Sequence, residues 1–236
     1  MSSATPGSSK MTIEELIDQF SSSSSRKRKT LLPTLEKRVQ EISNLGPKAL
    51  SSFDSNGDDW GAGWILQIVN KHFPEALSTF TSSSSWFTTP SSVGINYAPL
   101  QKHLLSQSFE EADRFTSAIL RKLAGEGAEN RGYVYFSEVK SIPDLDLTTI
   151  DRLWTAFSQG KFGFSKQACL LKALNGSYEM LWPRIGWKKD GIWTRYPGSF
   201  NWSIDAPEGH MPLINQLRGV RLIDALLNHP ALVSRT

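Results

Sequence analysis

Apolar residues recur every three or four positions along most of this chain, and this spacing limits the folds open to it. A clear case is LTTIDRLWTAFSQG, where the spaced residues are Ile150, Leu153, Trp154 and Phe157. Another is LLPTLEKRVQEISNLG, with Leu35, Val39 and Ile42. A helix with this pattern gathers its apolar side chains on one face, which must pack against another element. The sequence therefore predicts an all-α fold.

Residues typical of helix starts set the expected boundaries. Thr12 and Glu15 stand three positions apart, as do Ser108 and Glu111, and this is the spacing of a capping box. We expect helices to begin after Thr12 and after Ser108, and another to begin near Thr148. The apolar face of the helix after Ser108 is expected to comprise Ala112, Phe115, Ile119 and Leu123.

Ser-rich stretches divide the chain into two patterned regions. Residues 1–11 read as a tail, because no apolar stretch follows them as in a secretory signal. Residues 12–80 are expected to form a small helical bundle. The Ser-, Thr- and Pro-rich residues 81–95 read as a linker. Residues 96–236 should then form a larger, mostly helical domain.

Composition narrows the class of protein. The hydrophobic share of 39% and the charged share of 21% are typical of a globular protein. The net charge is +3, and the excess lies in residues 96–236, which carry 17 basic and 14 acidic side chains. This excess is too weak for a general nucleic-acid binder but suits a local anion site. No stretch approaches the roughly 20 apolar residues that span a bilayer.

Cysteine and histidine usage argues against disulfides and metal ligation. Cys169 is the single cysteine, so an internal disulfide framework is excluded, and a reducing compartment is expected. Because it lies in the apolar run ACLLKAL, we expect it to be buried. No two histidines have metal-ligand spacing; the four are His72, His103, His210 and His229.

Aromatic and basic residues are concentrated near the C-terminus. Within about two dozen residues lie Trp182, Trp187, Trp193, Tyr196, Phe200 and Trp202, interleaved with Lys188, Lys189 and Arg195. Asp190-Gly191 is a hairpin turn signal. Pro197 and Gly198 would interrupt a second strand, so we favour an ordered loop over a hairpin.

The helix expected in PLINQLRGVRLIDALLNH carries a polar stripe. Asn215, Arg218 and Arg221 step by three along it, and Gly219 beside them leaves room for a flat surface. We expect this to be the last helix, ended by Pro230. Aromatic walls with a few arginines describe a pocket for a large, flat, apolar molecule that bears carboxylates. The residues alone equally allow the tryptophans to be core and the arginines to pair locally, as the i,i+3 spacing of Arg221 and Asp224 permits.

Two other functions remain open from the residues alone. Asp205, Glu208 and His210 lie close together in sequence and could supply acid–base catalysis in an enzyme. Aromatic residues interleaved with basic ones also occur in modules that bind single-stranded nucleic acid. The small net charge and the high aromatic share of the segment count against that second alternative.

Six segments, in order, resemble the genomes-uncoupled-four family of tetrapyrrole-binding proteins that stimulate magnesium chelatase. They fall between residues 97 and 230 and read SFEEADRFT, YFSEVKSIPDLDLTTIDRLW, SQGKFGFSKQ, WPRIGWKKDGIWTRYPGSFNW, DAPEGHMP and NQLRGVR. The helical region before them is similar to the N-terminal bundle of cyanobacterial members. The resemblance implies an all-helical second domain with a concave, apolar cleft.

The resemblance also implies ligands, a partner and a role. The ligands would be protoporphyrin IX and Mg-protoporphyrin IX, with no intrinsic cofactor and no nucleic acid. The partner would be the large, porphyrin-binding subunit of magnesium chelatase, and the protein a non-enzymatic regulator of chlorophyll biosynthesis. We expect a cytoplasmic monomer, or a chloroplast one in a eukaryote, with any contact to thylakoid or other membranes peripheral.

Site residues follow from the same resemblance. The apolar floor of the cleft corresponds to Phe136 and Val139. A mobile aromatic loop corresponds to Trp193, Tyr196 and Phe200, although the family often has a tryptophan where this chain has Tyr196. The polar rim that faces the propionates corresponds to Asn215, Arg218 and Arg221.

Overall fold

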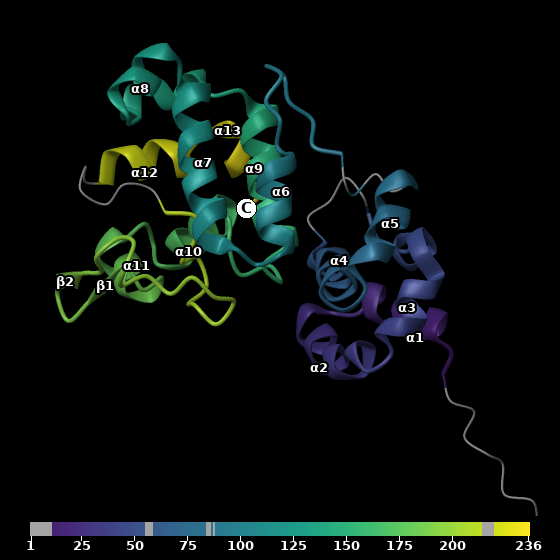
Figure 1. Cartoon of the computed structure of the whole chain (residues 1–236). Helices are drawn as coiled ribbons and strands as arrows, with labels where there is room; N and C mark the ends of the chain where they lie inside the picture. Colours follow the sequence, from purple (N-terminus) through teal and green to yellow (C-terminus); the bar gives the residue numbers. More distant parts are fainter. Residues whose placement is uncertain (1–10, 55–58, 84–85, 87, 214–219) are drawn as a thin grey trace, which may run out of the picture.

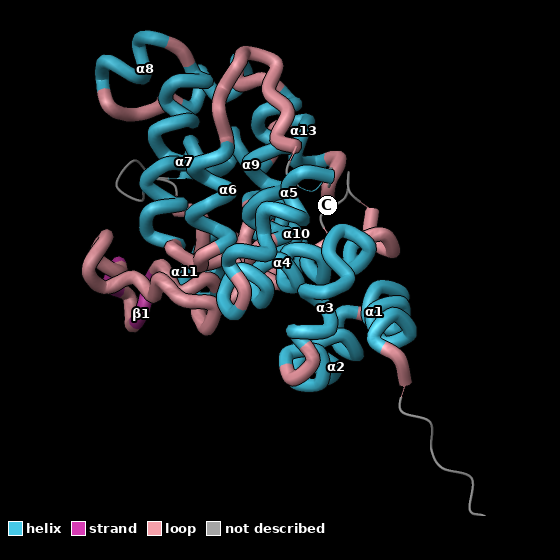
Figure 2. Tube along the Cα trace, turned by 45° about the vertical axis from the view of Figure 1, so that its right-hand side comes forward, coloured by secondary structure: helices cyan, strands magenta, loops and turns pink. Residues whose placement is uncertain are grey.

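The structure is a computed structural model that describes residues 11–54, 59–83, 86, 88–213 and 220–236. Helices dominate it, and the strands that it describes form one short hairpin (Figure 2). The predicted all-α fold class is therefore confirmed. None of the described helices is long and apolar enough to cross a lipid bilayer.

The described helices fall into two groups along the chain (Figure 1). The first group, in which η marks a 3₁₀-helix, comprises α1 (Ile13–Ser22), α2 (Ser25–Glu36), α3 (Val39–Leu45), η1 (Gly46–Leu50), α4 (Trp60–His72), η2 (Pro74–Ala76) and α5 (Leu77–Ser83). The second comprises α6 (Ala98–Leu105), α7 (Phe109–Ala124), α8 (Glu126–Arg131), η4 (Phe136–Ser141), α9 (Asp144–Ala156), α10 (Phe164–Ala173), α11 (Tyr178–Arg184), β1 (Lys188–Lys189), β2 (Ile192–Trp193), α12 (Val220–Leu227) and α13 (Pro230–Val233).

The first group packs around an aromatic centre. Phe20 of α1 is fully buried, and its ring centroid lies 5.7–6.1 Å from those of Phe53, Trp60 and Trp64. The capping box predicted at the start of α1 is confirmed, because Thr12 and the N3 glutamate exchange both hydrogen bonds. Edge-to-face rings of this kind add to the free energy gained by burial alone.

Helix α4 joins the two groups. The side-chain amide of Gln67 donates hydrogen bonds to the carbonyls of Leu104 (3.0 Å) and Phe157 (2.7 Å), at the ends of α6 and α9. One turn earlier, Gly63 lies so close to α9 that a Cβ there would be 2.1 Å from the carbonyl oxygen of Ala156. Buried residues of both groups belong to one hydrophobic cluster. The division of the chain at residues 81–95 stays a proposal.

Two expected helix starts differ in detail from the structure. Helix α7 does begin after Ser108, but the serine side chain makes no capping hydrogen bond. Helix α9 begins at Asp144, four residues before Thr148, directly after Pro143. Acidic residues in that first turn favour the earlier start, since they complement the positive end of the helix dipole.

The segment expected to be an ordered loop contains a hairpin. Strands β1 and β2 pair in antiparallel fashion, with Lys188 opposite Trp193. Asp190 and Gly191 form the turn, with φ of 51° and 80°, as a two-residue hairpin loop requires. The expectation was wrong because each strand has only two residues, so the hairpin ends before Pro197 interferes.

Two further expectations were wrong, namely that the helix before Pro230 is the last one and that Cys169 is buried. Pro230 does not end the last helix but begins α13, which His229 caps by accepting the N–H of Ala231. Cys169 is exposed rather than buried, because α10 turns the face that carries Phe164 and Gln167 toward the core.

The contact at Gly63 generates a stability prediction. Gly63→Ala should lower the free energy of unfolding by about 3 kcal/mol, because the added methyl group meets the backbone of α9. Urea denaturation followed by circular dichroism measures this change. Gly127→Ala in α8 is the matched control, since its Cβ would meet nothing closer than a side-chain atom 3.7 Å away. That control should be neutral or stabilising by up to about 1 kcal/mol, and equal effects of the two substitutions would contradict the prediction.

Candidate functional site

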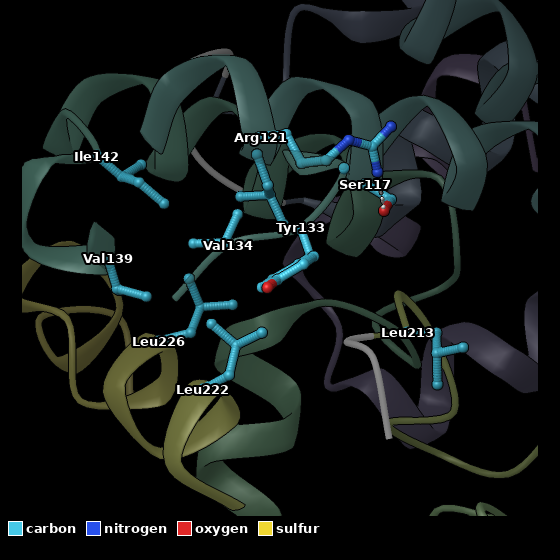
Figure 3. Close-up of a pocket in the computed structure, with 11 residues that line it drawn as sticks. Ser117, Arg121, Tyr133, Val134, Val139, Ile142, Leu213, Leu222 and Leu226 are labelled. Carbon is cyan, nitrogen blue, oxygen red and sulfur yellow. Dashed lines mark hydrogen bonds between the residues drawn. The ribbon is translucent and has the colours of Figure 1, made fainter. Parts of the chain in front are cut away.

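An apolar hollow opens between α7, η4 and α12 (Figure 3). Its walls are formed by Ser117, Leu120, Arg121, Gly132, Tyr133, Val134, Val139, Ile142, Leu213, Leu222 and Leu226. Val134, Val139, Leu222 and Leu226 point toward one another at its centre. The cavity holds about 80 Å³, less than the roughly 300–1,000 Å³ of a pocket that encloses a drug-sized ligand. A larger molecule would have to lie across the mouth.

Two arginines stand near this hollow. Arg121 of α7 lines it and donates a hydrogen bond to the Ser117 hydroxyl at 3.0 Å. The guanidinium of Arg221, on α12, lies 5.6 Å from the centre of the Phe136 ring. Phe136 is 48% exposed, whereas Val139 one turn later is only 2% exposed. Cationic groups therefore flank apolar surface, which suits a ligand with an apolar body and anionic substituents.

The 3₁₀-helix η4 is held in place by Glu138. Its carboxylate accepts the backbone N–H of Tyr135 at 2.7 Å and pairs with Arg131 at 2.6 Å. Both interactions lower the pKa of Glu138. The Arg131 guanidinium also covers the rings of Tyr133 and Tyr135, 4.9 and 4.0 Å from their centres. The residues ahead of η4 are thus fixed before any ligand arrives.

The hairpin presents an exposed aromatic tip. Ile192 is 74% exposed, and Trp193 is partly exposed beside it. The Trp193 ring packs on Trp182 of α11, which stacks on Trp187 with the planes 7° apart. The Nζ atom of Lys188 lies 5.5 Å from the Trp193 ring. The hairpin is therefore supported by a row of tryptophans.

Tyr196 and Phe200 differ in their surroundings. Tyr196 is partly exposed, and its hydroxyl faces Asp113 and Arg114 of α7. Phe200 is only 7% exposed and packs against Trp202 and the His210 ring, with centroids 5.5 and 4.9 Å away. Phe200 therefore belongs to the packing of this segment rather than to its exposed surface.

His210 has a structural environment. Its ring is buried, with Nδ1 2.6 Å from the carbonyl oxygen of Ile185 and Nε2 3.3 Å from the backbone nitrogen of Asn201. A neutral ring that donates from Nδ1 and accepts at Nε2 satisfies both contacts. Burial lowers the pKa of His210 below its usual 6.5. With both nitrogens engaged by backbone, His210 has no free nitrogen for the acid–base role considered above.

The structure brings together some of the predicted site residues. Phe136, Val139 and Arg221 lie where η4 packs on α12. Trp193 and Tyr196 are exposed on the aromatic segment, and Phe200 is buried within it. Asn215 and Arg218 lie outside the described residues. The roles of all eight residues in binding stay predictions.

Sequence reasoning missed most of the walls of the hollow. The predicted apolar face of α7 is correct at Ala112 and Leu123, which are buried, but it omits Leu120 and Arg121. In the structure the buried face also includes Asp113 and Thr116, and buried polar residues are invisible to an apolar pattern. The YVYF run at 133–136, which is apolar and follows a glycine, was an available signal for this wall.

Comparison with known proteins places the chain in a family. Residues 90–230 match the GUN4-like family, and this stretch is more than half of the chain. The chain belongs to the GUN4-like family. The resemblance to the genomes-uncoupled-four family is thereby confirmed.

Several relatives of this GUN4-like chain have been catalogued. A Ycf53-like protein of Synechocystis sp. is 51% identical over 144 residues, which are 61% of this chain and 62% of the relative. The uncharacterized protein ycf53 of Cyanidium caldarium is 40% identical over 202 residues, 85% of this chain and 76% of the relative. The chloroplastic tetrapyrrole-binding protein of Arabidopsis thaliana is 38% identical over 141 residues, 56% and 53% of the two chains. The chain thus spans less than two thirds of the length of the first and third of these relatives.

Solved structures agree with this assignment. The structure of GUN4 from Chlamydomonas reinhardtii matches with a TM-score of 0.59 and 38% identity, covering 63% of this chain and 95% of that one. The ligand-free structure of Arabidopsis thaliana GUN4 matches with a TM-score of 0.54 and 37% identity, covering 61% and 99%. The mostly helical fold is therefore shared with solved members of the family.

The environment of His210 generates a pH prediction. Because its pKa is lowered in the fold, the unfolded chain takes up a proton first as the pH falls below 6.5, and stability is lost in that window. His210→Gln removes this term. The stability difference between the original protein and His210→Gln should therefore be largest above pH 6.5 and shrink below it. Urea denaturation from pH 5 to pH 8 measures the difference, with His103→Gln on α6 as control. A difference that stays constant with pH would refute this account.

Proposed function

We propose that this chain binds a tetrapyrrole across the hollow between α7, η4 and α12. The observation that carries the proposal is an apolar hollow with arginines beside it, in a chain related to a protein named for tetrapyrrole binding. The ligands that fit best are protoporphyrin IX and Mg-protoporphyrin IX, because each is a flat apolar ring with two propionates.

Apolar contact would supply most of the affinity. One edge of the macrocycle would enter the hollow, where Val134, Val139 and Leu222 form apolar walls. Its face would cover exposed rings such as Phe136. Removing apolar surface from water contributes roughly 25 cal/mol per Å² before the costs of ordering are subtracted. The exposed Trp193 would close over the other face as its hairpin moves, and the exposed ring of Tyr196 would lie beside it.

Arginines would orient the propionates. Arg121 lines the hollow from α7, and Arg221 of α12 lies over the Phe136 ring of η4. An arginine can hold both oxygens of one carboxylate through parallel hydrogen bonds. Asn215 and Arg218, which precede α12 in sequence, would complete this polar rim. The ligand's two anionic groups would thereby fix its rotation in the site.

Magnesium would arrive inside the macrocycle rather than through a site of the protein. In the part of the chain that the structure describes, no three His, Cys, Asp or Glu side chains are grouped so as to hold a metal ion. The metal would be part of the cargo, and the chain would carry no cofactor of its own.

The biological role would be regulation rather than catalysis. By presenting its tetrapyrrole to the large, porphyrin-binding subunit of magnesium chelatase, the chain would stimulate that enzyme in chlorophyll biosynthesis. We propose that it acts as a monomer in the cytoplasm of a cyanobacterium or in a chloroplast. Any association with a membrane would be peripheral.

Ligand binding is tested by titration with protoporphyrin IX while tryptophan fluorescence is followed. Quenching is expected, and Arg221→Glu should weaken binding on the order of tenfold, because it replaces an attraction to a propionate with a repulsion. Arg26→Glu on α2 makes the same change in net charge on an exposed residue of the first helical group. Binding unaffected by Arg221→Glu, or weakened equally by the control, would count against the proposed site.

Stimulation is tested in a reconstituted magnesium chelatase assay with limiting protoporphyrin IX. Adding the chain should raise the rate of magnesium insertion several-fold, and Arg221→Glu should lose most of this effect. Arg26→Glu should keep it. Tight porphyrin binding without any stimulation would leave a tetrapyrrole carrier but would contradict the regulatory role.

A further inference from the structure

A buried carboxylate, Asp113, lies where three segments around the hollow meet. It belongs to the first turns of α7 and is 2% exposed. It accepts the backbone N–H of Leu213 at 2.6 Å. The hydroxyl of Tyr196 faces the same carboxylate and acts to lower its pKa. Both contacts join residues far apart in sequence.

Each partner of Asp113 belongs to a different part of the proposed site. Leu213 lines the hollow directly and precedes the residues that lead to α12. Tyr196 is the exposed ring of the aromatic segment. On α7 itself, Ser117 and Arg121 follow Asp113 by one and two turns and also line the hollow. One carboxylate therefore connects α7, the aromatic segment and the approach to α12.

The surroundings of Asp113 bring its pKa into the neutral range, where small changes of pH alter its charge. Burial raises its pKa to about 7, although the N–H of Leu213 and the hydroxyl of Tyr196 act against this rise. Glu110 raises the pKa and Arg114 lowers it, and those two residues pair with each other at 2.5 Å. His210, in the same loop as Leu213, titrates below 6.5. Asp113 is thus the group expected to change charge near pH 7.

We propose that Asp113 is a positioning residue that sets the tetrapyrrole affinity of the hollow by holding Leu213 and Tyr196 in their bound places. This inference rests on the proposed function and adds a group that regulates the ligand affinity. An ionised carboxylate attracts both the N–H of Leu213 and the hydroxyl of Tyr196 with charge assistance. A protonated one must use an oxygen as a donor and holds the two segments less firmly. Affinity should therefore rise as the pH increases through 7.

A ligand-free experiment tests the contact itself. In ¹⁵N-labelled full-length protein, the amide resonance of Leu213 should shift with pH with a midpoint near 7, because its acceptor changes charge. The resonance should not titrate in this range in Asp113→Asn. A Leu213 resonance that titrates identically in both proteins would overturn the assignment.

A second experiment measures the dissociation constant for protoporphyrin IX between pH 6 and pH 8. The original protein should bind several-fold more tightly at pH 8 than at pH 6. Asp113→Asn should show a flat profile near the weaker value, and Tyr196→Phe should bind more weakly than the original at pH 8 but keep part of the pH dependence. Asp113→Asn removes a buried charge. The free energy of unfolding of this variant at pH 8 should therefore not decrease, although its affinity for protoporphyrin IX does.

Asp146 provides a matched control. It is also buried, and it accepts the hydroxyl of Tyr97 at 2.8 Å and the N–H of Ser92 at 3.0 Å, the same kinds of donor as Asp113. None of these three residues lines the hollow. Asp146→Asn should keep the original pH profile of binding.

The outcomes separate the two proposals. Binding that keeps its affinity and pH profile in Asp113→Asn, or that Asp146→Asn changes equally, would overturn the role of Asp113 alone. Absence of protoporphyrin binding in every protein at every pH would overturn the proposed function and this inference with it.

Discussion

Buried carboxylates fix the irregular parts of this molecule to its helices. Asp113, Asp146 and Asp151 each lie inside a helix with at most 2% exposure. An ionised group in such a place is costly unless donors surround it. Most of the groups that face these carboxylates lie between or after helices, namely Ser91, Ser92 and Tyr97 for Asp146, Arg235 for Asp151, and Tyr196 and Leu213 for Asp113. Ser165, which also donates to Asp151, lies in the first turn of α10. The helices pack through apolar faces, but these three groups decide where the connections run.

The same feature explains which parts of the fold could be predicted. Helical spacing and the cap at Thr12 rest on local chemistry, so the sequence predicted the all-α class and the start of α1 correctly. Asp113 and Thr116 broke the apolar pattern of α7, although both are buried. Their burial depends on partners about 38 to 100 residues away, and spacing along one helix carries no information on such partners. The hairpin was mispredicted for a different reason. Each of its strands has only two residues, which are too few for the alternation typical of a strand to appear in the sequence.

The candidate site was only partly accessible to sequence reasoning. The resemblance located Phe136, Val139 and Arg221, which the structure does bring together. The hollow itself is assembled from residues in the range 117–142, from Leu213, and from Leu222 and Leu226. Periodicity says which face of each helix is apolar, but it does not say which faces meet. Leu120 and Leu222 could therefore be assigned to the core from their pattern but not to a common wall.

The bridge made by Gln67 shows how the second helical group depends on the first. Its amide occupies two carbonyls at the ends of α6 and α9, and water satisfies exposed carbonyls of that kind equally well. Removing the first helical group would leave both carbonyls to water and would uncover the end of α9 that Gly63 contacts. The first group therefore shields part of the backbone of the second group from water.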